Sequence, residues 1–488
     1  MSTRKAIAFS YVDRYSSLII FFLTSTIIAR LLTPEQVGVF SVTMIIIGFM
    51  APFRDLGASQ YLIQEKELTR TRIQAVWAVQ LFLNALLSLL IFASRNFVAE
   101  FYHRPEISSI MDVLAVSSLL VPFGALTIAW LTRELRFERL AIIRSGGALT
   151  GSAVSIAFAW SGHGPISLAY GALTSSLMIA FLSMFFRPRH FPWLPGTREI
   201  SKVLSFGTSI SGISLLNQAY QGTPELILGR IQGMYTAGIF SRAQGLVNLF
   251  ERLMMDSIYA VALPTFSKLH HQGDQLDSAF FKSISIVYAL GWSLLMFIAV
   301  MANPIINLLY GPQWSQSVDI TRILCLSACF YLIITLFPAL LIATGKRMIV
   351  LRLTVINVAL QGGLSLVGGS LGLYWMGWGI TLASLLISLI WMHVTQKISG
   401  FSWHHFRISL WKSAIIALSS MAVPLLAAFI FRGHPDQLVA PLLIGGIGML
   451  VGIMVSARKV AHPLWSEIEQ ILIFLRKRFS PAIRNNRD

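Results

Sequence analysis

The sequence predicts an all-α integral membrane protein with about 14 transmembrane helices, and three observations lead to this fold class. Of the 488 residues, 55% are hydrophobic and 12% are charged, with a mean hydropathy of +0.69. A soluble domain averages about 45–50% apolar and about 25% charged residues, so an ordinary soluble enzyme is excluded. The other two observations are a series of long apolar runs and the uneven placement of lysine and arginine between them.

Fourteen apolar runs are long enough to cross a bilayer as helices, which takes about 17 to 25 residues each. The loops between them are shorter than the roughly 40 residues that an independently folded domain needs, so the protein is expected to act within the membrane. The runs lie at 8–31, 37–58, 75–94, 109–132, 145–161, 165–186, 203–222, 234–262, 284–303, 319–344, 349–367, 375–395, 410–431 and 437–456.

Lysine and arginine concentrate on one side of these spans. Thirty of the 38 fall on the side of the N-terminus, five on the opposite side and three within spans. Because cytoplasmic loops carry the excess of positive charge, both termini are expected in the cytoplasm. The formal net charge of +17 is scattered among the loops and forms no concentrated patch, so no nucleic-acid partner is expected.

A displacement of 200 residues aligns the segments 27–41 and 227–241, each of which covers the outer end of an odd-numbered span and the start of the next. Six spans separate them, so the two halves run in the same direction, a transporter architecture with the substrate cavity between the halves. The identical pairs are Ile27/Ile227, Arg30/Arg230, Gly38/Gly238, Phe40/Phe240 and Ser41/Ser241.

This repeat divides the chain into four parts. We predict a six-helix bundle at 1–200, a second at 201–400, two additional transmembrane helices at 401–460 and a cytoplasmic basic amphipathic tail at 461–488. In the first copy, Thr33-Pro34-Glu35-Gln36 has the spacing of a capping box with proline at the first helical position, which predicts a sharp start of the second span.

The repeated segments also carry a resemblance to a known family. The segment 29–38 (ARLLTPEQVG), with 55–57 (DLG) and 61–64 (YLIQ), resembles the N-terminal signature of bacterial oligosaccharide flippases. These form the polysaccharide transporter branch of the multidrug/oligosaccharidyl-lipid/polysaccharide superfamily. The segments 227–230 (ILGR) and 237–243 (AGIFSRA) look like the corresponding element at the start of that family's second half.

The resemblance implies a function and a location. A protein of this kind would move undecaprenyl-diphosphate-linked oligosaccharide from the cytoplasmic to the periplasmic leaflet of the bacterial inner membrane, by alternating opening of two six-helix bundles. Its partners would be the lipid-linked oligosaccharide and the membrane, and the resemblance allows association with a polysaccharide polymerase and export machinery. A transporter of this kind is expected to be no enzyme and to need no cofactor. The chain has no phosphate-binding loop and no metal-ligand spacing, so we expect no ATP hydrolysis and no bound metal.

Charged residues within spans are the candidate functional residues, because a charge at the bilayer centre costs about 2.5–3.5 kcal/mol even on lenient scales. Arginine offers a planar fork suited to diphosphate oxygens. Buried carboxylates could act in gating or couple transport to protons. The predicted headgroup path comprises Arg14, Arg54, Arg230, Arg242 and Arg252, and the gating or proton-coupling carboxylates are Asp13, Asp55, Glu225, Glu251 and Asp256.

Two clusters stand out among these residues. At the inner ends of the first two spans we predict cross-helix pairing of Asp13 with Arg54 or of Arg14 with Asp55. The pair would be a static lock, a pair that breaks during opening, or one that contacts the lipid diphosphate. On the eighth span, Arg242, Arg252 and Asp256 fall within about 80° of one helix face. That stripe lines a cavity or binds helices together.

Two rival functions stay open. A cation-coupled drug or small-molecule exporter of the same superfamily would favour a few carboxylates in an apolar pocket, whereas this chain has an excess of arginine in its spans. A membrane-embedded polysaccharide polymerase or ligase would carry catalytic residues on a long outer loop, and every outer loop here is short.

Overall fold

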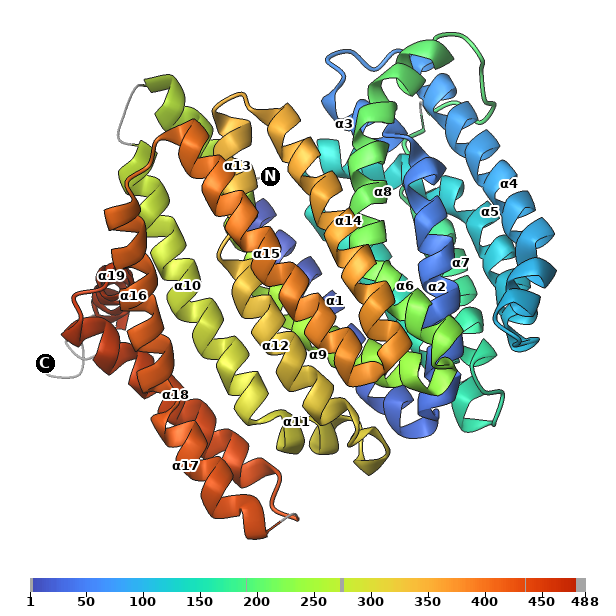
Figure 1. Cartoon of the computed structure of the whole chain (residues 1–488). Helices are drawn as coiled ribbons and strands as arrows, with labels where there is room; N and C mark the ends of the chain where they lie inside the picture. Colours follow the sequence, from blue (N-terminus) through green and yellow to red (C-terminus); the bar gives the residue numbers. More distant parts are fainter. Residues whose placement is uncertain (1–2, 190, 273–275, 435, 480–488) are drawn as a thin grey trace, which may run out of the picture. The chain divides into compact units, whose positions relative to one another are not determined.

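A computed structural model describes residues 3–189, 191–272, 276–434 and 436–479, and Figure 1 shows the arrangement of their helices. Within these ranges every regular element is a helix, which confirms the predicted all-α class. Eleven helical segments of the described residues are long and apolar enough to cross a membrane. The chain is therefore a multi-pass membrane protein.

The chain forms two compact units, residues 1–241 and 242–488. The predicted boundaries at 200, 400 and 460 fall at the start of α8, the end of α15 and the end of α18. Unit 1 contains α1 (Thr3–Leu31), α2 (Pro34–Asp55), α3 (Ala58–Gln64), α4 (Arg70–Phe101), α5 (Glu106–Arg133), α6 (Phe137–Trp160), α7 (Ile166–Phe185), α8 (Ile200–Ile231) and the first residues of α9 (Met234–Gln272).

Unit 2 contains the rest of α9 and the helices that follow it. These are α10 (Leu276–Val300), α11 (Ala302–Leu309), η1 (Pro312–Trp314), α12 (Ser317–Leu332), α13 (Phe337–Ala343), α14 (Arg347–Leu371), α15 (Leu373–Ser399), α16 (Trp403–Ser420), α17 (Ala422–Ile430), η2 (Phe431–Gly433), α18 (Val439–Lys459) and α19 (Pro463–Phe479).

Two predicted single helices are broken in unit 2. The run 319–344 is divided between α12 and α13, and the run 410–431 between α16 and α17. Each second piece has a proline near its start, Pro338 or Pro424. Proline has no N–H to donate, and its ring clashes with the carbonyl four residues earlier, so the helix breaks just before it.

The N-terminal start of α2 has the predicted cap. The Thr33 hydroxyl accepts a hydrogen bond from the Gln36 backbone N–H at 3.3 Å, and the Gln36 side chain accepts from the Thr33 N–H at 3.1 Å. Pro34 occupies the first helical position. The reciprocal bonds satisfy two N–H groups that a helix start otherwise leaves unpaired.

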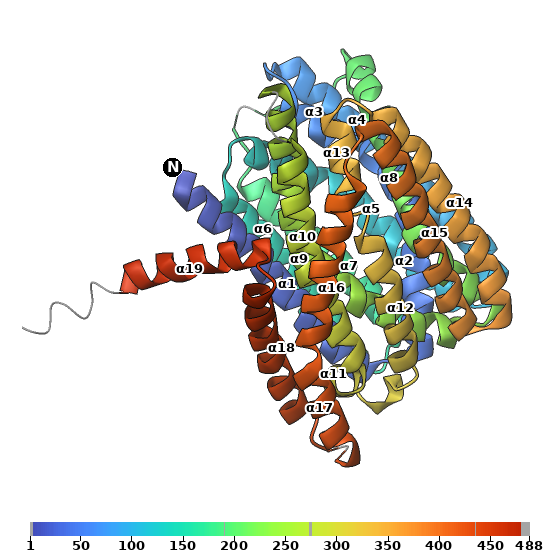
Figure 2. The ribbon, with the colours of Figure 1, turned by 60° about the vertical axis from the view of Figure 1, so that its left-hand side comes forward.

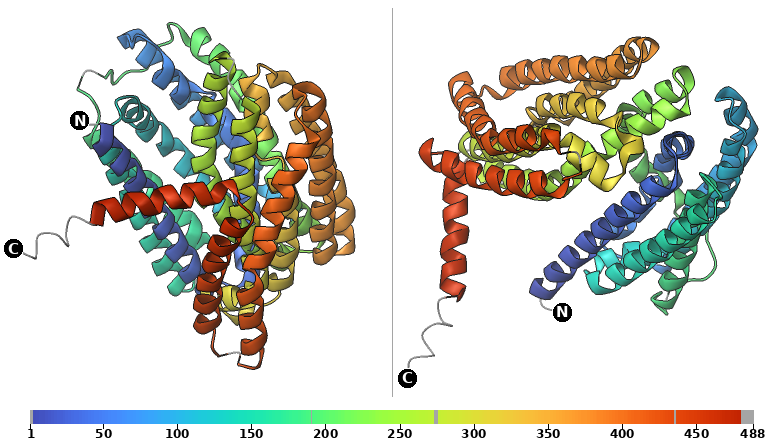
Figure 3. Two further views of the ribbon diagram at one scale, coloured as in Figure 1. Left: turned by 90° about the vertical axis from the view of Figure 1, so that its left-hand side faces the viewer. Right: turned by 90° about the horizontal axis from the view of Figure 1, so that it is seen from below.

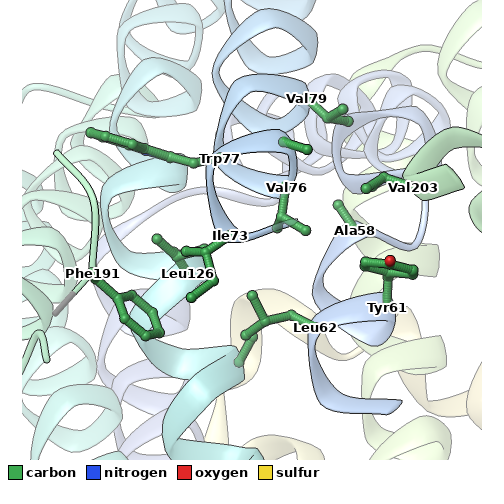
Figure 4. Close-up of a cluster of buried hydrophobic side chains, with 12 residues drawn as sticks. Ala58, Tyr61, Leu62, Ile73, Val76, Trp77, Val79, Leu126, Phe191 and Val203 are labelled. Atoms are coloured by element: carbon green, nitrogen blue, oxygen red, sulfur yellow. The ribbon is translucent and has the colours of Figure 1, made fainter. Parts of the chain in front are cut away.

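Unit 1 has an apolar cluster at the end where α4 starts, and Figure 4 shows its side chains. Short helix α3, α4, α5 and α8 all contribute to it, together with Phe191 from the segment between α7 and α8. Arg187 of the same segment contacts two indole rings. Its Cζ lies 4.7 Å from the ring centroid of Trp77 and 4.4 Å from that of Trp193. These contacts fasten the segment between α7 and α8 to the start of α4.

Small and hydroxylated residues line the close helix contacts within each unit. In unit 1, the Ser117 and Ser176 hydroxyls lie 2.9 Å apart, between α5 and α7. In unit 2, those of Ser327 and Ser384 lie 2.8 Å apart, between α12 and α15. Hydroxyl bridges of this kind join helices in membranes, where apolar association gives no driving force.

The predicted amphipathic tail forms α19, which leaves the end of α18 at a sharp angle and extends away from the other helices of unit 2 (Figures 2 and 3). Lys282 Nζ lies 2.7 Å from Glu467 Oε1 and ties α19 to α10.

At the junction of α18 and α19, His462 Nδ1 accepts from the Leu464 N–H at 3.1 Å, and its Nε2 lies 3.2 Å from the Ser413 hydroxyl. Burial lowers the pKa of His462 to about 4, with Lys412 acting in the same direction, so the ring is neutral at pH 7.

Candidate functional site

The two copies of the repeat meet at their glycines, within unit 1. A Cβ added to Gly38 of α2 would lie 1.9 Å from the Met234 carbonyl oxygen, and one added to Gly238 of α9 would lie 1.8 Å from the Pro34 carbonyl oxygen. The contact is reciprocal, because each glycine faces the residue four positions before the other. Two like helices crossing about a two-fold axis produce this arrangement.

Charged and aromatic groups surround this crossing. Arg104, in the turn after α4, forms an ion pair with Glu35 in the first turn of α2. Tyr102 OH donates to the Leu226 carbonyl of α8 at 3.4 Å. Burial raises the pKa of Tyr102 to about 12, with Arg230 acting in the opposite direction, so the phenol keeps the proton that it donates.

Arg230 and Glu225, two of the predicted site residues, lie on α8 near this crossing. The Arg230 side chain is exposed and its Cζ lies 4.9 Å from the ring centroid of Phe101, within the range of a cation–π interaction. Glu225 follows Pro224 within the helix, and only 5% of it is exposed. One helix, α8, thus carries both an exposed cation, Arg230, and a carboxyl group buried in the protein interior, Glu225.

Asp55, at the C-terminal end of α2, is held by hydrogen bonds within unit 1. Its carboxylate accepts from the Ser59 N–H at 3.1 Å, from the Ser59 hydroxyl at 2.8 Å and from Gln80 Nε2 at 2.9 Å. Gln80 is a polar residue of α4 with only 1% of its surface exposed. We call Asp55, Ser59 and Gln80 the Asp55 cage. Sequence reasoning missed Ser59 and Gln80, although a glutamine inside a predicted span was the available signal.

Arg54 neighbours the cage. Its side chain is half-buried and forms no ion pair among the described residues, while its backbone carbonyl accepts from Asn84 Nδ2 at 3.2 Å. Asp13 and Arg14, the predicted partners of Arg54 and Asp55, have side chains outside the described residues. The predicted cross-helix pairing therefore stays a prediction.

Arg242 lies on α9 at the start of unit 2, beside two aromatic rings. Its Cζ is 5.7 Å from the ring centroid of Tyr310 and 5.4 Å from that of Trp314. Trp314 is completely buried. Both rings belong to the connection between α11 and α12, about 70 residues along the chain, so no local pattern could have linked them to Arg242. Arg252 and Asp256, the other charged residues of the predicted stripe, have side chains outside the described residues, and so does the neighbouring Glu251.

Two further ion pairs lie on the side predicted to be outer. Asp319 and Arg322 pair at 2.8 Å in the first turns of α12. Arg95 Nη1 lies 2.6 Å from Asp112 Oδ1 and joins α4 to α5. These pairs are partly exposed to solvent, where such contacts contribute about 0–1 kcal/mol, so we assign them no role beyond local packing.

The chain matches the model of a known protein family. The family model described as "Polysaccharide biosynthesis protein" matches residues 27–319, more than half of the chain. The chain belongs to this family. The match covers both glycines of the crossing, the Asp55 cage and the Arg242 site.

Two curated relatives and one solved structure are similar to the chain over most of its length. The chain is 22% identical over 416 residues to the lipopolysaccharide biosynthesis protein WzxC of Escherichia coli K12, covering 84% of each chain. It is 22% identical over 463 residues to the succinoglycan biosynthesis transport protein ExoT of Rhizobium meliloti, covering 91% of each. The structure of the lipid II flippase MurJ in an inward closed conformation matches with a TM-score of 0.76 at 14% identity, over 93% of this chain and 100% of that one. At that identity, the likeness shows the fold.

Proposed function

We propose that this protein is a flippase for lipid-linked oligosaccharide in the bacterial inner membrane. It carries undecaprenyl-diphosphate-linked repeat units from the cytoplasmic to the periplasmic leaflet for the synthesis of a cell-surface or exported polysaccharide. The single observation that carries the proposal is the family match over residues 27–319 of a chain whose described part is helical and rich in membrane spans. The chain's similarity to WzxC and ExoT along most of their length points to the same process.

The finer architecture belongs to the same proposal. We infer fourteen spans in two parallel six-helix repeats with two additional helices, and both termini in the cytoplasm. The reciprocal crossing of Gly38 and Gly238 supports the repeat, and the placement of lysine and arginine supports the orientation. Polysaccharide polymerase and export machinery would be partners in the same membrane.

The headgroup path is proposed to use the arginines of the spans. Arg242 is the best-supported member, because two aromatic rings hold its side chain in place at the start of unit 2. A guanidinium can bind two phosphate oxygens at once, and a diphosphate that crosses a low-dielectric region needs such a partner. Arg14, Arg54, Arg230 and Arg252 would complete the path. Glu225, buried on α8, is the best-supported proton-coupling carboxylate, beside Asp13, Asp55, Glu251 and Asp256.

The test is leaflet accessibility. The purified chain is reconstituted in liposomes with an undecaprenyl-diphosphate oligosaccharide, and the fraction that an external glycan-cleaving reagent can reach is followed with time. We expect protein-dependent exposure, and a rate at least about tenfold lower in Arg242→Gln, corresponding to a lost charge-assisted contact.

A matched control separates this effect from a general loss of positive charge. Arg347, the first residue of α14, is exposed and forms no hydrogen bond or ion pair among the described residues, so Arg347→Gln should flip at the wild-type rate. Absence of exposure with any undecaprenyl lipid, with a proton gradient imposed in either direction, would overturn the proposal and favour a small-molecule exporter.

A further inference from the structure

A groove of about 660 Å³ lies between α10, α12 and α16, within unit 2. Its volume is in the range of about 300–1,000 Å³ that ligand pockets occupy. Ten of its 11 lining residues are apolar, and the remaining one is Arg407 near the start of α16. None of them belongs to the predicted headgroup path. The groove therefore combines a long apolar surface with one positive charge.

The break between α12 and α13 shapes the floor of the groove. Because α12 ends at Leu332, the Ile333 N–H donates to the Phe330 carbonyl at 3.1 Å. The Cys329 carbonyl accepts instead from Trp292 Nε1 of α10, at 2.9 Å. The indole thereby satisfies its only polar hydrogen inside the protein and contributes ring carbons to the groove.

The length of the groove matches one leaflet of a bilayer. Along α16 it extends from Arg407 to Leu418, which is about 16 Å at 1.5 Å per residue. The hydrocarbon core of a bilayer is about 30 Å thick, so one leaflet contributes about 15 Å. Trp411, one turn after Arg407, also lines the groove and is 70% exposed. Tryptophan is enriched at the boundary between lipid and water.

Arg407 is available for a ligand. Its side chain is exposed and forms no hydrogen bond or ion pair among the described residues. Two other cations of unit 2 are engaged, Lys282 with Glu467 and Arg322 with Asp319, and Arg347, which is also unpaired, does not line the groove. An unpaired guanidinium at the end of an apolar groove is complementary in charge to a lipid phosphate.

We propose that this groove binds one anionic phospholipid from the leaflet at the Arg407 end, which the charge pattern predicts to be cytoplasmic. The phosphate lies on Arg407 and one acyl chain lies along α16 as far as Leu418. A phospholipid chain fits the length of one leaflet, whereas an undecaprenyl chain is longer than that. The site is separate from the transported lipid, and its existence does not depend on the proposed flippase activity.

The test measures lipid retained by the purified full-length chain, by native mass spectrometry after incubation with phosphatidylglycerol. Arg407→Gln removes the headgroup contact and should weaken retention about fivefold, since one cation near the surface contributes about that factor. Ala414→Phe fills the middle of the groove and leaves its charge intact, and it should weaken retention to a similar or greater extent. Diacylglycerol with the same chains but no phosphate should bind the wild type as weakly as phosphatidylglycerol binds Arg407→Gln.

Two control variants match these changes elsewhere in unit 2. Arg347→Gln removes another exposed, unpaired arginine, and Ala359→Phe enlarges an exposed alanine outside the groove; both residues lie on α14. Both variants should retain lipid like the wild type. Equal retention by Arg407→Gln and Arg347→Gln would overturn the proposal. Displacement of phosphatidylglycerol by undecaprenyl phosphate from the wild type, and not by glycerol phosphate, would assign the groove to the transported lipid and also overturn it. Arg407 is exposed, so its replacement keeps the test valid even where Ala414→Phe fails to fold.

Discussion

Helices α2 and α9 begin alike and end differently. At their N-terminal ends, the repeated segments bring Gly38 and Gly238 into backbone contact. Towards the C-terminal end, α2 stops at Asp55, while α9 continues as one helix to Gln272. The repeat is thus preserved in sequence where its two copies touch each other, and it has diverged where each copy meets different neighbours.

The position where α2 ends shows how large the divergence between the two copies is. The 200-residue displacement places Met255 opposite Asp55. The Asp55 carboxylate has three hydrogen-bond donors in its cage, whereas Met255 is buried and its sulfur accepts from the Thr335 hydroxyl at 3.7 Å. After Asp55, Leu56 and Gly57 have φ of 39° and 68°, a left-handed conformation that ends α2. One copy therefore turns at this point and the other does not.

The largest expected effect comes from adding a methyl group at the crossing. In Gly38→Ala or Gly238→Ala, the new Cβ meets a backbone carbonyl at less than 2 Å, and no side-chain rotation can relieve the clash. The helices must separate, so we expect a loss of stability of about 3 kcal/mol, at the upper end of overpacking effects. Thermal unfolding of the purified protein in detergent measures it.

The matched control is Gly363→Ala on α14. Gly363 is also helical, but a Cβ there meets nothing within 4 Å. Alanine forms helix better than glycine by about 1 kcal/mol, so this variant should be as stable as the wild type or more stable.

The double variant at Gly38 and Gly238 should lose less stability than the sum of the two single losses, because both substitutions act on one crossing. Additive effects would contradict the reciprocal contact.

The sequence predicted local features of the fold, but it did not predict contacts between distant residues. Apolar runs predicted where the helices lie, and the capping box at Thr33 and the tail helix at 463–479 were predicted by local pattern. The repeat identified Gly38 and Gly238 as equivalent, but an alignment cannot tell that equivalent residues touch. Arg242 contacts Tyr310 and Trp314, which are distant in the sequence. Such contacts depend on how helices pack, and the periodicity of a single helix does not predict packing between helices.

The next largest effect is expected at Asp55, where α2 ends. Asp55→Ala leaves three donors of the cage without their acceptor, which should cost about 2 kcal/mol, because hydrogen bonds to charged groups contribute about 1.5–3 kcal/mol. Asp55→Asn keeps one acceptor oxygen and should cost about half as much. At the equivalent position of the other copy, Met255→Leu conserves volume and should cost less than about 1.5 kcal/mol.

These variants also distinguish a structural cage from a gating charge. A structural role predicts that flipping activity in Asp55→Asn falls only in proportion to the folded fraction, measured by unfolding in the same detergent. Loss of flipping in Asp55→Asn at unchanged stability would mean that the charge itself acts, in agreement with a gating pair.

A smaller effect is expected from the cap that only the first copy has. Thr33→Ala removes the hydroxyl that accepts from the Gln36 N–H and should destabilise the protein by about 1 kcal/mol. Thr33→Ser restores an acceptor and should recover most of that loss. The second copy has Gly233 at this position, with φ of +90°. Its turn therefore relies on a left-handed backbone conformation, whereas the first copy has a side-chain cap. Equal destabilisation by alanine and serine would show that the hydroxyl does not cap α2.

The smallest effect is expected for the ion pair of Glu35 with Arg104, which the second copy also lacks, since Tyr235 stands at the equivalent position. The two side chains are 44% and 35% exposed, and exposed pairs contribute about 0.2–1 kcal/mol. A double-mutant cycle with Glu35→Gln and Arg104→Gln, measured by thermal unfolding, should give a coupling of about 0.5 kcal/mol that shrinks as salt is raised. A coupling above about 2 kcal/mol that salt does not change would contradict the weak, screened interaction expected of an exposed pair.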